Sequence, residues 1–168
     1  DLIVGAFYAD GPGREDAGKL YFFTSELLAE IRATTGVLDL AEPWPPGVGV
    51  VIGPDASTRL GVWMAVGDVN GDGVADVVVG ADQASGFGDD APSFETGRVY
   101  VLYGPLAPGE AIDLRDATRP MSVVYGIDAL DHAGSTVASG DVNGDGFADV
   151  VIGAAALGTL RNAYDHAG

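Results

Sequence analysis

The sequence contains no cysteine and only one lysine, Lys19, among its 168 residues. The absence of cysteine excludes disulfide bonds and thiolate metal sites. Long apolar runs are also missing, and no stretch approaches the roughly 20 residues that a membrane-spanning helix needs. Hydrophobic residues nevertheless make up 47% of the chain. We therefore expect a folded domain with a core and no transmembrane segment.

Basic residues are scarce: 8 Lys and Arg face 25 Asp and Glu, for a net charge of −17. Such a chain repels a phosphate backbone, which argues against a nucleic-acid partner. Asp outnumbers Glu by 19 to 6, and Asp is the shorter acid, favoured in turns and oxygen-ligand loops. A solvated acidic surface explains part of this excess. Both interpretations can hold together.

Glycine is plentiful, with 26 residues spread along the chain, which favours short strands joined by many turns. The chain opens at Asp1, in the middle of a repeated pattern. No initiating methionine or signal peptide precedes it, and we interpret the sequence as part of a longer protein.

Two segments, 50–81 and 123–154, match without a gap at an offset of 73 residues. The opening residues 1–6 repeat the end of the same unit, and 18–23 resembles 97–102. Each unit offers four strand candidates, which we term A to D in chain order: 62–66, 77–79, 98–103 and 122–125. The B strand is apolar at every position, which requires cover on both faces. An all-β fold follows, a partial β-propeller of four-stranded antiparallel blades.

Three intervals divide this propeller. Residues 1–60 hold strands B, C and D of a preceding blade, 61–126 one complete blade, and 127–168 strands A and B of the next. Repeat units of this kind need neighbours to cover their faces, so the remaining blades of a parent chain are expected partners. Extra residues between strands C and D fall near 25–35, where the spacing of Leu27, Leu28 and Ile31 predicts a short helical turn.

The pattern Asp-x-Asn-x-Asp-Gly-x-x-Asp occurs twice, each time between strands A and B. Carboxylates at alternate positions of a tight loop converge, and calcium prefers six to eight oxygen ligands with flexible geometry. We expect two Ca²⁺ ions. Their predicted ligands are Asp68, Asn70, Asp72, the Val74 carbonyl and Asp76 in loop 1, and Asp141, Asn143, Asp145, the Phe147 carbonyl and Asp149 in loop 2.

A hairpin turn without metal is the alternative, since Asn-Gly and Asp-Gly form tight turns unaided. Two copies with identical acids favour the metal. Magnesium suits a rigid all-protein cage poorly. An EF-hand needs flanking helices and a carboxylate at the twelfth position, where this chain has Val79 and Ile152.

The run from Gly67 to Ala81 and its copy from Gly140 to Ala154 resemble the FG-GAP repeat of integrin alpha subunits. The Phe-Gly of that family is replaced here by Leu60-Gly61 and Ala133-Gly134, and its Gly-Ala-Pro by residues 80–82 and 153–155. The resemblance implies a seven-bladed ring with calcium in the A–B hairpins. It also implies a protein or carbohydrate ligand on the opposite face, where the B–C loop (82–96) and the D–A loop (53–60) lie.

On that face Phe87, Phe94 and Arg59 are candidate recognition residues, although they can equally pack the loops. The run 13–19 imitates a phosphate-binding loop but leads into a strand rather than a helix. His132 and His166 are expected to face solvent, and Trp44 and Trp63 to pack.

Two functions remain open. The first is a non-catalytic, calcium-binding adhesion or recognition module outside the cell or at its surface, where calcium is millimolar. The second is an accessory propeller of a secreted hydrolase or lyase whose catalytic domain lies elsewhere.

Overall fold

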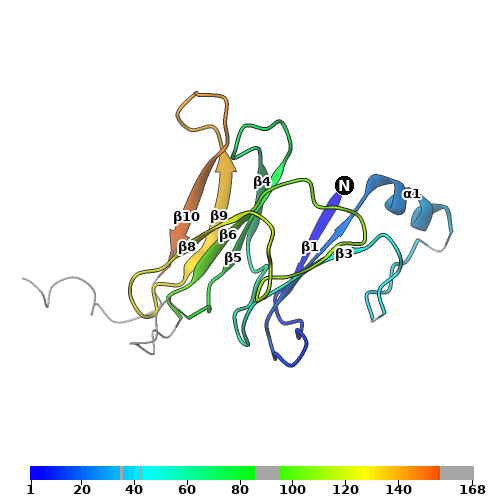
Figure 1. Ribbon diagram of the computed structural model, residues 1–168, viewed down its shortest axis with the longest axis horizontal. Helices are drawn as coiled ribbons and strands as arrows, with labels where there is room; N and C mark the ends of the chain where they lie inside the picture. Colours follow the sequence, from blue (N-terminus) through cyan, green and yellow to red (C-terminus); the bar gives the residue numbers. More distant parts are fainter. Residues whose placement is uncertain (35, 42, 86–94, 156–168) are drawn as a thin grey trace, which may run out of the picture.

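The computed structural model describes residues 1–34, 36–41, 43–85 and 95–155, which form three β-sheets standing side by side (Figure 1). The first has the order β1-β2-β3-β7, the second β4-β5-β6-β8 and the third β10-β9. The strands are Leu2–Ala6 (β1), Lys19–Phe23 (β2), Gly49–Ile52 (β3), Met64–Gly67 (β4), Asp76–Ala81 (β5), Arg98–Leu102 (β6), Ala111–Asp113 (β7), Met121–Tyr125 (β8), Ala133–Gly140 (β9) and Asp149–Ala154 (β10).

The second sheet contains all four strands expected of one repeat, in chain order and antiparallel throughout. Its A strand, β4, begins two residues later than predicted, whereas B, C and D lie at the expected positions. The first sheet supplies B, C and D of the repeat before it, and the third supplies A and B of the repeat after it. The second sheet spans Met64–Tyr125. The division of the chain into blades at residues 61 and 126 stays an interpretation.

Strand β5 explains why the B strand is apolar at every position. Val77 and Val79 join the cluster that fills the space between the first and second sheets. Val78 points the other way and joins the cluster between the second and third sheets. All three are at most 3% exposed. Both faces of the central sheet are therefore covered, as predicted for stacked blades.

One edge differs from the prediction of purely antiparallel blades. The connection between β6 and β8 forms β7, which pairs with β3 of the preceding sheet in parallel. The Val50 amide donates to the Glu110 carbonyl at 2.8 Å, and the Leu114 amide to the Ile52 carbonyl at 3.0 Å. Ile112 is buried between the sheets. The added strand satisfies the otherwise open edge of β3, and no local pattern signalled it.

The expected helical turn is a nine-residue helix, α1 (Ser25–Ala33). The hydroxyl of Thr24 caps its start by accepting the Leu27 amide. Apolar residues of the helix and the following segment cover the outer face of β2 and β3: Leu27, Leu28, Leu38, Leu40 and Trp44. The predicted packing role of Trp44 is confirmed. That of Trp63 is wrong: it stands just before the first paired residue of β4 and is 51% exposed.

The hairpins between A and B strands project from one end of the sheets, and the B–C and D–A connections lie at the other (Figure 1). None of the helical segments in the described ranges has the length and hydropathy that a bilayer crossing needs.

Candidate functional site

Loop 1 (68–76) joins β4 to β5 and loop 2 (141–149) joins β9 to β10, each ending on the first residue of the second strand. Strands flank both loops, as predicted, and this excludes the helix-flanked EF-hand. Two glycines in each loop have positive φ, from 76° at Gly71 to 90° at Gly146. A side chain is disfavoured in this left-handed region, which is why the tight turn takes glycine at these positions.

The first Asp of each loop gathers backbone amides. The Asp68 carboxylate accepts the amides of Gly71, Asp72 and Gly73 at 2.7, 3.1 and 2.9 Å. Asp141 does the same in loop 2, with bonds of 2.7, 3.1 and 2.9 Å. These amide bonds lower the pKa of Asp141 below its usual range, because they stabilise the ionised carboxylate.

Further side-chain oxygens bond the amide two residues ahead. Asn70 accepts the Asp72 amide at 2.9 Å, and Asp72 accepts the Val74 amide at 2.8 Å. Loop 2 repeats both bonds, through Asn143 and Asp145. The two loops thus share one internal scaffold, built from the same positions of the repeat.

The ninth position closes each loop. One Asp76 oxygen accepts the Val69 amide at 2.9 Å, and the other accepts the Gly104 amide, also at 2.9 Å. Asp76 is fully buried, so it ties its loop to the turn after β6. Asp149 bonds the Val142 amide in the same way, but its second oxygen receives the Asn143 side chain at 3.3 Å.

The candidate ligand atoms of each loop are all oxygens, from carboxylates, side-chain amides and backbone carbonyls. Oxygen ligands suit a hard cation such as calcium. In this conformation the carboxylates turn toward their own backbone amides. Across the described ranges no three His, Cys, Asp or Glu side chains converge closely enough to hold a metal ion. A carboxylate oxygen has more than one acceptor position, so the amide bonds leave acceptor capacity. The ten predicted ligands remain a prediction, with the residues of each five sharing one loop.

The end of the sheets opposite loops 1 and 2 also shows one arrangement that occurs twice. The Arg59 amide donates to the Asp16 carbonyl at 3.1 Å, and the His132 amide to the Glu95 carbonyl at 3.2 Å. All four of these residues have φ of 52–53°, a conformation uncommon outside glycine. Each D–A connection is therefore hydrogen-bonded to the B–C connection of the sheet that it leaves.

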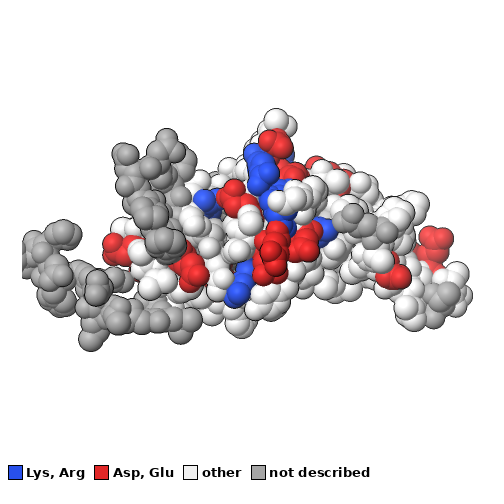
Figure 2. Space-filling view, turned by 90° about the horizontal axis from the view of Figure 1, so that it is seen from below, with Lys and Arg blue, Asp and Glu red and all other residues white. Residues whose placement is uncertain are grey.

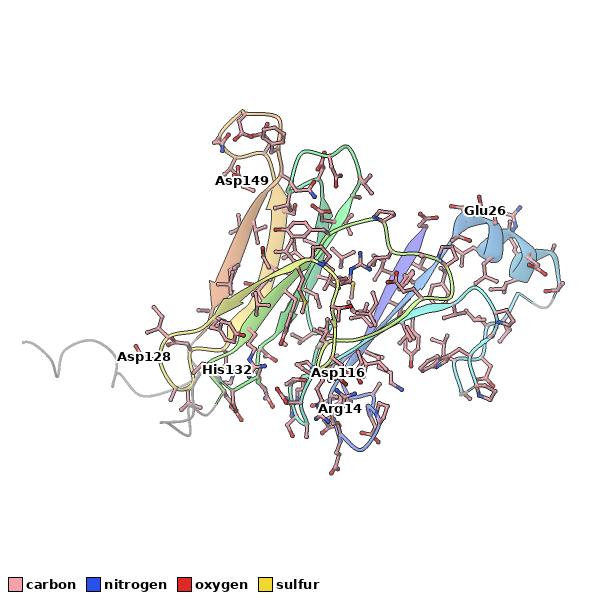
Figure 3. All side chains as sticks on the ribbon, viewed as in Figure 1. Arg14, Glu26, Asp116, Asp128, His132 and Asp149 are labelled. Carbon is pink, nitrogen blue, oxygen red and sulfur yellow. The ribbon has the colours of Figure 1, made fainter. Side chains whose placement is uncertain are left out.

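His132 lies in one of these connections and is buried, which corrects the expectation that it faces solvent. Its Nδ1 lies 3.2 Å from the Asp82 carbonyl oxygen and its Nε2 3.5 Å from a Glu95 carboxylate oxygen. The turn that starts the A strand folds the ring inward. Burial raises the pKa of the nearby Asp82, an effect that His132 and Arg59 oppose. In Figure 3 His132 and Arg14 lie at the same end, away from Asp149. His166 lies outside the described residues.

Arg59 stacks its guanidinium on the Tyr8 ring, 4.8 Å from the ring centroid. Tyr8 is 56% exposed, and the pair offers an aromatic and cationic surface at the junction of the first two sheets. Phe87 and Phe94, the other candidates for this face, lie outside the described residues.

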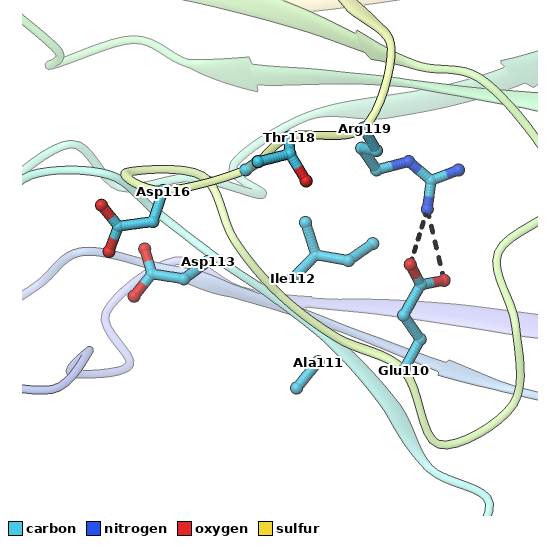
Figure 4. A pocket seen from close by; sticks show the side chains of 8 residues that line it. Glu110, Ala111, Ile112, Asp113, Asp116, Thr118 and Arg119 are labelled. Atoms are coloured by element: carbon cyan, nitrogen blue, oxygen red, sulfur yellow. Dashed lines mark hydrogen bonds and ion pairs between the residues drawn. The ribbon is translucent and has the colours of Figure 1, made fainter.

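A cavity of about 310 Å³ lies beside β7 (Figure 4). Arg119 binds Glu110 at 3.1 and 3.2 Å and also donates to the carbonyls of Tyr103 and Pro105. The arginine therefore pins the connection that carries β7. This structural role was not apparent from the sequence.

Comparison with known proteins decides the family. The FG-GAP repeat matches residues 60–102 and 133–167. The first segment begins just ahead of β4 and the second at the first residue of β9, and each runs through one of the acidic loops. This chain contains FG-GAP repeats. With the three stacked sheets, the match identifies the fold as part of an FG-GAP β-propeller, as the sequence predicted.

Two groups of curated proteins carry similar FG-GAP regions. Phosphatidylinositol-glycan-specific phospholipase D of Rattus norvegicus is 37% identical over 107 residues, which are 64% of this chain and 12% of that protein. Integrin alpha-IIb of Mus musculus is 30% identical over 122 residues, 72% of this chain and 11% of that protein. Integrin alpha-5 of Xenopus laevis is 34% identical over 103 residues, 61% of this chain and 9% of that protein. The chain spans about a tenth of the length of these relatives.

Proposed function

We propose that this chain is a non-catalytic, calcium-binding FG-GAP propeller module that presents recognition loops outside the cell or at its surface. The observation that carries the proposal is the shared scaffold of loops 1 and 2. The same five positions of each loop carry the oxygen atoms that are candidate calcium ligands. The equivalent backbone amides donate to the first Asp of each loop. Three carboxylates per loop repel one another, and a divalent cation relieves that repulsion.

Bound calcium would stabilise the arrangement of the strands that each loop connects. Each loop joins strands A and B of a sheet, and ordering the loop fixes how those two strands pack against the neighbouring sheet. The recognition loops lie at the far end of the same strands. Calcium sites of extracellular modules bind weakly, in the range of about 10⁻⁴ to 10⁻³ M, and are filled where calcium is millimolar. The similarity to integrin alpha subunits supports the same location.

The face opposite the calcium loops carries both signs of charge close together (Figure 2). Arg98 binds Asp55 at 3.1 Å on this face, and the Arg59–Tyr8 stack is nearby. Mixed charge with an exposed aromatic ring suits a protein or carbohydrate ligand rather than a polyanion.

Calorimetric titration with calcium tests the proposal. The wild type is expected to bind two ions, and Asp72→Ala and Asp145→Ala are each expected to lose one. The chain is also expected to melt at a lower temperature with chelator than with millimolar calcium. Two results count against the metal: no heat of binding in the wild type, or unchanged heat in both variants.

The similarity to phosphatidylinositol-glycan-specific phospholipase D supports a second candidate, an accessory propeller of a secreted hydrolase or lyase. The sequence of the full parent gene separates the two candidates. A neighbouring catalytic domain supports the enzyme accessory, whereas adhesion modules or a membrane anchor support the recognition module.

A further inference from the structure

The two acidic loops touch each other. The Phe147 ring of loop 2 lies against the backbone of loop 1, so closely that a Cβ added at Gly71 would lie 2.1 Å from the ring carbon Cε1. The Ala148 amide of loop 2 donates to the Asp68 carbonyl of loop 1 at 2.8 Å. Figure 1 shows the loops rising together from the same end of neighbouring sheets.

The contact of the Phe147 ring involves residues that also build the loops' internal scaffolds. Gly71 has a φ of 76° and donates its amide to Asp68, so the ring of Phe147 presses on the turn that holds the first carboxylate of loop 1. Phe147 is the seventh residue of loop 2, whose backbone carbonyl is a predicted calcium ligand. Its amide is held in turn by Asp145 at 2.9 Å. A ligand that orders the Phe147 backbone therefore also orders the part of loop 1 that the Phe147 ring contacts.

The equivalent position of loop 1 makes a different contact. Val74 corresponds to Phe147 at the repeat offset, but its side chain lies by Gly104, in the turn after β6. The contact between the loops is thus made by the seventh residue of loop 2. Val142, an exposed side chain of loop 2 that is not a predicted ligand, provides a control residue within the same loop.

We infer that the two loops bind calcium cooperatively, with an ion in loop 2 strengthening binding in loop 1 through Phe147 and Ala148. The inference rests on the proposed calcium function. An ion in loop 2 orders the Phe147 backbone, so loop 1 loses less conformational freedom when its own ion binds. Repulsion between the ions acts in the opposite direction. Because most of the predicted ligand residues are exposed or half-buried, solvent and salt screen that repulsion, and ordering dominates.

Calcium titration followed by amide NMR measures each loop separately, using Gly71 and Gly73 for loop 1 and Gly144 and Gly146 for loop 2. With loop 2 disabled by Asp145→Ala, loop 1 is expected to bind about fivefold more weakly, at the low end of common coupling strengths. Phe147→Ala keeps the carbonyl ligand and removes the ring. It is expected to weaken loop 1 by a similar factor while loop 2 still binds. Val142→Ala trims an exposed loop 2 side chain that is not a predicted ligand, and it should leave loop 1 within about twofold of the wild type.

Two outcomes would overturn the coupling. Loop 1 affinity unchanged in both Asp145→Ala and Phe147→Ala, with calcium still bound, means independent sites and overturns the coupling alone. No calcium-dependent shift in wild-type loops overturns the calcium function and the coupling with it. If Phe147→Ala loses its folded spectrum, Phe147→Leu replaces it, and an intermediate weakening of loop 1 supports the coupling.

Discussion

The guanidinium of Arg14 and the carboxylate of Asp113 form a two-bonded ion pair between neighbouring repeats. Arg14 lies in the β1–β2 connection and Asp113 ends β7, 99 residues later. One of the two bonds measures 2.7 Å, and the same guanidinium nitrogen donates to the carbonyls of Gly53 and Pro54 at 2.8 and 3.0 Å. Arg14 is buried. The pair fastens β7 to the sheet it completes.

Replacing Arg14 by Ala should lower the free energy of unfolding by about 2 kcal/mol, because the Asp113 carboxylate and two carbonyls lose their donor. Arg14→Lys keeps the charge but not the planar fork, and should cost less. Urea unfolding of the full chain measures both. Arg32→Ala, on the exposed side of α1, is the control and should change stability by under about 0.5 kcal/mol.

The same pair predicts a pH dependence. The bond from Arg14 lowers the pKa of Asp113 below its usual range. A lowered folded-state pKa contributes stability that is present above the unfolded value, near 3.9, and is lost as the pH falls through the folded pKa. Unfolding measured between pH 7 and pH 2 should therefore show a smaller acid loss in Asp113→Asn than in the wild type. If the free energy of unfolding falls equally with decreasing pH in both proteins, the ion pair contributes nothing to acid sensitivity.

Asp76 and Asp149 occupy the same repeat position but should respond differently to Asn. Each Asp76 oxygen accepts a backbone amide, and an Asn side chain would place a donor against one of these amides in a fully buried site. Asp76→Asn should cost about 2 kcal/mol in the presence of chelator. Asp149→Asn should cost under about 1 kcal/mol, because water reaches its half-buried side chain. Chemical denaturation without calcium compares them, and equal losses would contradict the bracing role of Asp76.

Gly80 lies where the backbones of the second and third sheets come close together. A Cβ there would lie 2.1 Å from the Gly134 carbonyl oxygen, whereas one at Gly140 would meet nothing within 4 Å. Gly80→Ala should therefore destabilise the chain by about 3 kcal/mol or prevent folding, because backbone atoms must shift. Gly140→Ala should be nearly neutral. Thermal melting followed by circular dichroism makes the comparison, and similar midpoints would show that the sheets can separate at no cost.

Local sequence patterns were enough to predict the A to D strands, the helix and the acidic loops. The 73-residue offset located the A, B, C and D strands, because strand periodicity and turn chemistry are local properties that each copy repeats. The uniform apolar character of Val77 to Val79 required two covered faces, and the stacked sheets supply them. The spacing of Leu27, Leu28 and Ile31 predicted α1. The ten candidate ligands follow from the same local pattern, and their binding of calcium stays a prediction.

Which distant groups meet follows from the packing of the sheets and not from any local pattern. The parallel pairing of β7, the Arg14–Asp113 pair and the burial of His132 depend on how sheets stack, and local periodicity carries no information on that. The contact of Phe147 with Gly71 is of the same kind. The two residues occupy different positions of equivalent loops, and only the packing of neighbouring sheets brings them together.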